Sequence, residues 1–275
     1  MLKRILVGLG GTPYTLAAMQ HALDLARRHQ AETTGVTVLE ASQVADVGPV
    51  PLGAGAAAAE LREHRVREIL AAQDEQIARF HRLFDSANCV ARVIRETGDP
   101  FEELTSLWRY HDLTILGLQG LFEYGVVRDP QDCVVRLIAK GVRPILAVAR
   151  EHRVIRRVVI AYNGSMGSAK TMKRFIQSRL WDDPEIHIVC FELPEGESRA
   201  LLHAAQDYCR AHGYEAAIHH VQESPRSGLP PFVERLGADL VVMGSTNRSR
   251  LAKLMLGDTA VHMLRHATIP LFLGQ

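Results

Sequence analysis

Two stretches of this chain share one pattern, a short β-branched apolar run that ends at a glycine followed by a hydroxyl residue. The first covers residues 5–12, with the sequence ILVGLGGT, and the second covers residues 158–165, with the sequence VVIAYNGS. A run of this kind predicts a strand that turns directly into a helix. The chain therefore builds the same turn twice, and an internal repeat narrows the possible folds more than any other feature of the sequence.

Two further pairs of segments repeat in the same order. Residues 113–117 (LTILG) match residues 240–244 (LVVMG), and residues 142–148 (VRPILAV) match residues 267–273 (ATIPLFL). Three landmarks in a common order predict that the two halves of the chain have the same fold.

The length of the chain agrees with two domains. It has 275 residues, and its hydrophobic content of 47% is enough for two buried cores of ordinary size. We predict domains at residues 1–150 and 154–275, because the charged residues 150–153 separate two strand patterns.

Strand and helix patterns alternate along both halves. In the first half we expect strands near 4–9, 33–40, 88–95, 112–117 and 143–149, and helices near 13–29, 60–86, 100–110 and 130–140. In the second half we expect strands near 156–162, 185–192, 214–221, 238–243 and 269–274, and helices near 166–179, 197–212, 229–236 and 257–266. This order predicts an α/β fold with two tandem doubly wound domains, each a five-stranded parallel sheet flanked by helices. Residues 41–59, rich in Ala, Gly and Pro, are expected to form a loop or lid.

The charge pattern argues against two classes of protein. The 32 basic and 31 acidic side chains are mixed along the sequence, which is not the footprint of a nucleic-acid binder. No window has the roughly eighteen uninterrupted apolar residues of a membrane-spanning helix, so we expect no membrane role and a cytoplasmic location. The four cysteines form no Cys-x-x-Cys pair, which favours reduced thiols over disulfides or zinc.

The carboxyl ends of the strands are where an open α/β sheet binds ligands. In the second half, Gly244 begins a segment that runs to Asn247 and is followed by nine residues and then Gly257, Asp258 and Thr259. This spacing resembles that of the universal stress protein family, in which Gly-x-x-Gly, nine residues and Gly-Ser or Gly-Thr wrap the ribose and phosphates of ATP. The resemblance implies that these five residues contact ATP or a related adenine nucleotide.

The second half departs from the family pattern at three positions. Asn163 stands where the family has an acidic residue, and it can hydrogen-bond a ribose hydroxyl without bringing a charge. Asn247 replaces a glycine, and Asn visits the left-handed region more readily than other non-glycine residues. Asp258 replaces the hydroxyl residue, and its carboxylate repels the anion that the helix amides attract.

The effect of Asp258 has two interpretations. If a nucleotide binds, the basic residues Arg248, Arg250 and Lys253 offset the carboxylate, and Arg248 then belongs to the site. Alternatively, Asp258 caps its helix and the three cations form a solvated face of a loop.

The first half is further from the family pattern. Gly117 and Gly120 fit its opening, but Pro130 and Gln131 stand nine residues later, and proline donates no amide hydrogen to a phosphate. The residues between them, 121–129, are more apolar and acidic than an anion site requires, so we expect this loop to pack against the other domain or a partner. We therefore place the ligand in the second half.

Other candidate sites have simpler explanations. The adjacent histidines His219 and His220 point to opposite faces of a strand, and we interpret them as surface residues rather than zinc ligands. The Gly-Asp-Pro segment at residues 98–100 is interpreted as a helix start. There is neither a Gly-x-Ser-x-Gly motif nor a P-loop.

Three classes of function remain open from the sequence alone: a nucleotide-responsive stress and signalling protein, an interaction scaffold without a ligand, and an enzyme that hydrolyses ATP or transfers adenylyl groups. We favour the first, because the glycine spacing survives in the second half and no base or nucleophile is evident. The resemblance further implies that the last strands of the two domains pair with each other and that two such chains form a homodimer.

Overall fold

The computed structural model describes residues 2–40, 54–122, 133–244 and 257–274. The first half contains, in chain order, β1 (Arg4–Gly8), α1 (Thr15–His29), β2 (Glu32–Leu39), α3 (Gly55–Asp85), β3 (Ala91–Thr97), α4 (Pro100–Trp108), β4 (Leu113–Gly117), α5 (Cys133–Ala139) and β5 (Ile145–Val148). The second half contains β6 (Arg157–Ala161), α6 (Met166–Ser178), β7 (Glu185–Phe191), α7 (Glu195–Ala211), β8 (Ala216–Val221), α8 (Pro225–Leu236), β9 (Leu240–Gly244), α9 (Asp258–His266) and β10 (Leu271–Gly274). The two halves therefore repeat the same order of strands and helices, as the sequence predicts.

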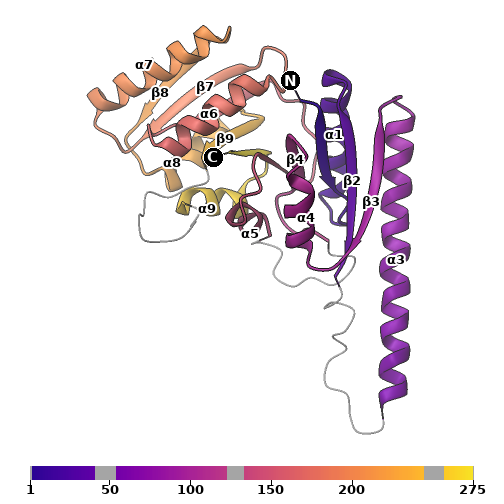
Figure 1. The fold of residues 1–275 in the computed structure, drawn as a ribbon. Coiled ribbons are helices and arrows are strands. Elements are labelled where there is room, and N and C mark those ends of the chain that lie inside the picture. The colour runs from indigo at the N-terminus through magenta and orange to yellow at the C-terminus, as the bar shows by residue number, and fades with distance from the viewer. Residues whose placement is uncertain (1, 41–53, 123–132, 245–256, 275) are drawn as a thin grey trace.

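All ten strands belong to one sheet, in the order β3-β2-β1-β4-β5-β10-β9-β6-β7-β8. Within each half the strands pair in parallel, and the two halves meet where β5 and β10 pair antiparallel, with Leu146 opposite Phe272. Figure 1 shows the two halves side by side, with α3 along the outer edge of the first half. The predicted pairing of the last strands is thus confirmed within one chain.

Helices cover both faces of this sheet. The core on one face joins α1 and α3 of the first half to α6 and α7 of the second. The core on the other face joins α4 and α5 to α8 and α9. Because β5 and β10 are direct neighbours in the sheet, each core contains residues from both halves instead of belonging to one half.

Two predicted helix starts, those of α3 and α8, are wrong by a full turn or more. Helix α3 begins at Gly55, so the part of the expected loop at residues 55–59 is helical, because alanine has the highest helix propensity. The rest of that loop, 41–53, lies outside the described residues. Helix α8 begins at Pro225 and not near residue 229, because the Ser224 side chain accepts a hydrogen bond from the Ser227 amide and proline suits the first helical position.

The predicted start of α4 is confirmed. The side chain of Asp99 accepts hydrogen bonds from the amides of Phe101 and Glu102, at 2.8 and 3.1 Å, and so starts α4. All four cysteines are free thiols. Among the described residues, no helix is long and apolar enough to span a membrane.

Candidate functional site

A cavity of 390 Å³ opens at the carboxyl ends of β6 and β9, where the strand order of the second half reverses. Open α/β sheets bind ligands at such a point, because the helices that follow the two strands diverge to opposite faces. The cavity is lined by Ala161, Tyr162, Asn163, Ser165, Ser168, Phe191, Glu192, Leu193, Pro225, Met243, Gly244, Gly257, Asp258, Thr259 and Ala260. Of the residues predicted from the sequence, Asn163, Gly244, Gly257, Asp258 and Thr259 therefore come together here.

The turn after β6 fixes the orientation of Asn163. Its Oδ1 accepts hydrogen bonds from the Ser165 amide at 3.1 Å and from the Ser168 hydroxyl at 2.9 Å. Gly164 takes a φ of 72°, which the tight turn requires, and Ser165 caps α6 through the Ser168 amide. Since both hydrogen bonds described for the Asn163 side chain use its carbonyl oxygen and the side chain is exposed, its Nδ2 amide remains available as a donor.

The first turn of α9 forms the opposite wall. Gly257 is the N-cap, with an ordinary φ of −66°, and a Cβ atom added there would meet no described atom within 4 Å. The first amides of a helix have no partner within the helix, and among the described residues no side chain caps those of α9. Gly257 therefore leaves open space above donor groups, which is what close approach of a ligand needs.

Asp258 does not have the capping role that was its alternative interpretation. It is the first helical residue, one position past the cap, and within the described part of the chain it makes no capping hydrogen bond. Its exposed carboxylate instead lies on the rim of the cavity, where it interacts favourably with the dipole of α9.

Gly244 has a packing role at the end of β9. An added Cβ would lie 3.0 Å from the carbonyl carbon of Gly167 and 3.1 Å from the amide nitrogen of Ser168. Glycine is thus required for β9 to approach the start of α6, and this contact closes the floor of the cavity.

The wall formed by the end of β7 was not predicted from the sequence. Phe191, Glu192 and Leu193 line the cavity, as does Tyr162 after β6. Burial, with the nearby Cys190 thiol, raises the pKa of Tyr162, so its phenol stays a neutral donor. Ligands bind at the carboxyl ends of the strands in an open α/β sheet, and this rule applies to β7, the neighbour of β6, as well as to β6 and β9. Applied to β7, it would have predicted Phe191, Glu192 and Leu193.

The corresponding place in the first half is filled by its own chain. A Cβ atom at Gly10 would overlap the carbonyl oxygen of Leu121, and Leu121 and Phe122 are 7% and 3% exposed. Gly117 packs against Tyr14, whose Cβ would lie 2.6 Å from an added Cβ. The expectation that this loop packs against the other domain or a partner is therefore wrong for Leu121, which covers the β1 turn of its own half.

Gln119 bridges from this loop to the second half. It accepts a hydrogen bond from the Tyr14 hydroxyl at 3.2 Å and donates one to the carbonyl oxygen of Arg265 in α9, at 3.1 Å. Gly120 has a φ of 75°, so it serves the loop's conformation. Neither Gly117 nor Gly120 lines the second-half cavity. Asn247, Arg248, Pro130 and Gln131 lie outside the described residues.

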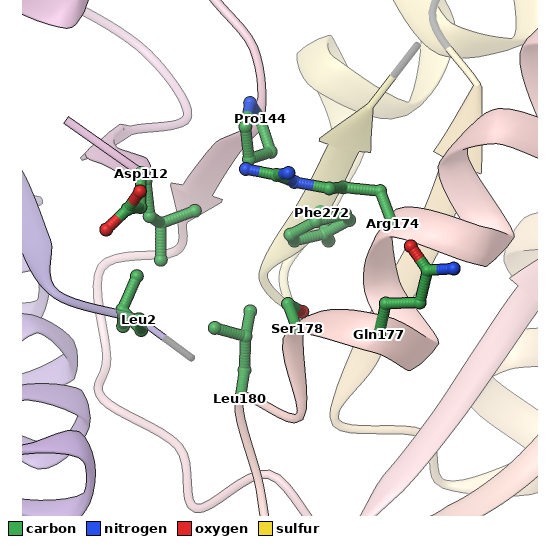
Figure 2. A pocket seen from close by; sticks show the side chains of 9 residues that line it. Leu2, Asp112, Pro144, Arg174, Gln177, Ser178, Leu180 and Phe272 are labelled. Atoms are coloured by element: carbon green, nitrogen blue, oxygen red, sulfur yellow. The ribbon is translucent and has the colours of Figure 1, made fainter. Parts of the chain in front are cut away.

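Two other cavities are less suitable for a ligand. One of 140 Å³ lies between the halves at the opposite end of the sheet, with Leu2, Leu180 and Phe272 among the side chains drawn in Figure 2. It is smaller than the roughly 300 Å³ at which ligand pockets begin. The other, of 610 Å³, is wide and open, and its Asp24 and Asp182 are paired with His152 and Arg28.

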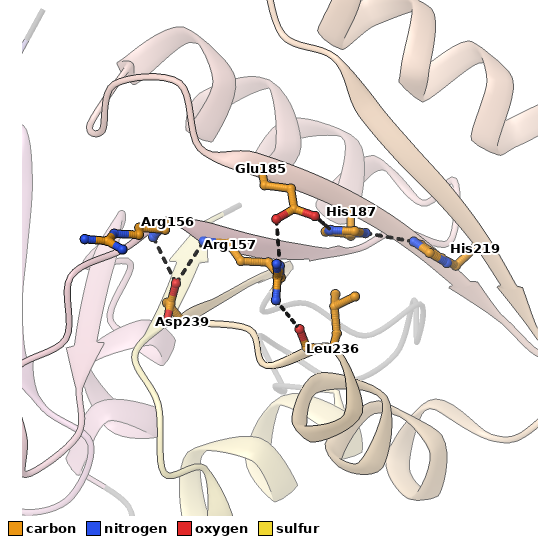
Figure 3. A network of polar contacts seen from close by, with 7 residues as sticks. All are labelled: Arg156, Arg157, Glu185, His187, His219, Leu236 and Asp239. Atoms are coloured by element: carbon orange, nitrogen blue, oxygen red, sulfur yellow. Dashed lines mark hydrogen bonds and ion pairs between the residues drawn. The ribbon is translucent and has the colours of Figure 1, made fainter.

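His187 and His219 belong to a polar network that starts at the amino ends of β6 and β7. Figure 3 shows Arg157 contacting Glu185 at 2.8 Å, Glu185 contacting His187 at 2.9 Å, and His187 contacting His219 at 2.9 Å. His220 points to the other face and contacts the Leu193 carbonyl at 3.0 Å. Within the described ranges, no three His, Cys, Asp or Glu residues are arranged to hold a metal ion.

A solved structure shares this architecture over nearly the whole chain. A universal stress protein from Archaeoglobus fulgidus aligns with 99% of this chain and 98% of its own, at a TM-score of 0.72 and 16% identity. A universal stress protein solved in complex with cAMP aligns with 45% of this chain and 98% of its own, at a TM-score of 0.39 and 22% identity.

Sequence comparison identifies the same group of proteins. A universal stress protein from Synechocystis is 26% identical over 184 residues, and the alignment spans 65% of this chain and 63% of the length of that relative. The model of the universal stress protein family matches residues 1–119 and 181–273. This chain belongs to the universal stress protein family.

Proposed function

We propose that this protein is a nucleotide-responsive stress and signalling protein that binds an adenine nucleoside or nucleotide in its second half. The observation that carries the proposal is the contrast between the two repeats. The β6/β9 switch point opens into a cavity of 390 Å³, whereas Leu121 and Phe122 fill the matching place beside β1.

The walls of the cavity offer the groups that a nucleoside needs. The Asn163 amide and the first amides of α9 are donors, and Thr259 adds a hydroxyl group on the same wall. Phe191, Leu193 and Met243 supply apolar surface for a base. Polar groups placed beside apolar side chains are what a small-molecule site needs to orient its ligand.

A ligand-free scaffold is the competing proposal, and the closed first half is the observation that favours it. In that case the second-half cavity would be a remnant of a site. The homodimer of tandem chains, the cytoplasmic location and the domain limits 1–150 and 154–275 remain predictions.

Calorimetry with adenosine, AMP and ATP tests the proposal. Gly257→Val should lower the affinity of whichever compound binds by at least about tenfold, because its side chain enters the open space at the start of α9. Gly196→Val is the matched control, since Gly196 in α7 also faces open space but lies outside the cavity.

Two results would count against it. If none of the three compounds binds the wild-type protein, the scaffold proposal replaces this one. If one binds and Gly257→Val leaves its affinity unchanged, the ligand lies elsewhere.

A further inference from the structure

The charged side chains that line the second-half cavity all carry the same sign. Among the described residues around it, Glu192 and Asp258 are the charged ones, and both are carboxylates. They come from different parts of the fold, since Glu192 directly follows β7 and Asp258 is the first residue of α9. The rim described by the structure is therefore negative on two sides.

Neither carboxylate is neutralised by a described neighbour. No hydrogen bond or ion pair joins Glu192 or Asp258 to a basic side chain within the described ranges, and both residues are exposed. The backbone of Glu192 is held in the left-handed region, at a φ of 62°, with its amide donating to the Val221 carbonyl at 3.2 Å. The Glu192 side chain thus starts from a fixed point on the cavity rim.

Apart from the first amides of α9, which attract anions, the polar groups of this cavity suit hydroxyls better than phosphates. A carboxylate accepts hydrogen bonds from sugar hydroxyls, as acidic residues do with ribose in dinucleotide sites. The Asn163 amide donates to a hydroxyl or ring acceptor without requiring a negative charge. A polyphosphate at the same place meets two like charges.

The repulsion between the two carboxylates and a phosphate is large enough to favour adenosine over ATP. A like charge at about 4 Å costs about 1 kcal/mol in water, or about fivefold in affinity, and salt weakens it. ATP carries several negative charges, AMP fewer and adenosine none, so the penalty is largest for ATP and absent for adenosine. Arg248, Arg250 and Lys253 belong to residues 245–256, outside the described ranges. A direct comparison of ATP and adenosine affinities includes any attraction of these cations for phosphate.

We infer that the second-half cavity selects adenine nucleosides without phosphate over ATP, and that Asp258 and Glu192 make this selection. The inference rests on the proposed function and deepens it by naming the ligand class. It also gives a role to Asp258, which replaces the hydroxyl residue of the family pattern. Its carboxylate weakens phosphate binding and can accept hydrogen bonds from hydroxyl groups.

The test is a charge series of adenosine, AMP and ATP, titrated calorimetrically at low salt in the presence of EDTA. We expect adenosine to bind at least about fivefold more tightly than ATP, with AMP between them. Asp258→Asn and Glu192→Gln should each strengthen ATP binding about threefold to fivefold without strengthening adenosine. Glu197→Gln is the control, because Glu197 is an exposed acid of α7 outside the cavity, and it should change nothing.

The failures of the two proposals are distinguishable. ATP binding more tightly than adenosine would overturn the inference and leave the proposed function intact. The same holds if Mg²⁺ added in place of EDTA makes ATP the tighter ligand, because the carboxylates would then hold the metal of a nucleotide complex. If no compound in the series binds, the proposed function itself fails.

Discussion

Asp112 and Asp239 occupy equivalent positions in the two halves, and each accepts two backbone hydrogen bonds through Oδ2. Asp112 receives the amides of Lys3 and Arg4, at 2.8 and 2.9 Å, at the start of β1. Asp239 receives the amides of Arg156 and Arg157, at 3.0 and 2.9 Å, at the start of β6. Asp112 thus joins the start of β1 to the start of β4, and Asp239 joins the start of β6 to the start of β9. The switch point of each half lies at the opposite, carboxyl ends of these strands.

Replacing either aspartate should destabilise the protein by a similar amount. Asp112→Ala and Asp239→Ala each remove two charge-assisted hydrogen bonds, and we expect each to lower the free energy of unfolding by about 1–3 kcal/mol in urea titrations. Asp207→Ala is the control, because Asp207 forms an exposed pair with Arg210 and should cost under about 0.5 kcal/mol. Equal stability of all three variants would show that the backbone contacts of the two aspartates contribute nothing.

The two glycines of the cavity should respond differently to alanine. Gly244→Ala puts a Cβ 3.0 Å from backbone atoms of α6, and we expect a loss of about 1–3 kcal/mol in the free energy of unfolding. Gly257→Ala meets no described atom and should stay within about 0.5 kcal/mol of wild type. A comparison of the two urea midpoints checks this, and a larger loss at Gly257 would contradict the packing role given to Gly244.

Buried His21 should make stability depend on pH. Burial is the main cause that lowers its pKa from 6.5 to about 4, His152 adds to the shift, and Asp24 opposes it. Because the folded protein binds this proton less readily than the unfolded chain, its contribution is complete above pH 6.5 and is lost as the pH falls to about 4. The contribution is of the order of 3 kcal/mol.

His21→Leu should flatten that part of the profile, since it removes the titrating ring while keeping an apolar side chain in the core. The measurement is the free energy of unfolding between pH 4 and 7, with His64→Leu, at an exposed position of α3, as the control. An unchanged slope in His21→Leu would assign the acid sensitivity to other groups.

Features encoded by short segments were predictable from the sequence. The strand landmarks, the Asp99 helix start and the turn at Asn163 and Ser165 depend on neighbouring residues, so their patterns suffice. The capping alternative for Asp258 is also decided locally, since a shift of one residue in the helix start makes Asp258 a first-turn residue instead of the cap. The early start of α3 at Gly55 shows that the helix propensity of a run of alanines outweighs the neighbouring Gly and Pro.

Features that depend on distant segments were not predictable in this way. The filling of the β1 turn by Leu121 and Phe122 requires the β4 loop to fold back over Gly10. The wall contributed by Glu192 requires β7 to lie beside β6, and its left-handed backbone has no sequence pattern of its own. Charge at the rim is therefore a property of the fold and not of any single motif.

Photolabelling with 8-azidoadenosine, followed by mapping of the labelled peptides, tests the placement of the ligand in the second half most directly. We predict label in peptides that contain residues 161–165, 191–193 or 257–260, and loss of that label when unmodified adenosine competes. Label concentrated in residues 8–14 or 117–122, where the first-half turn is closed by its own loop, would contradict that placement.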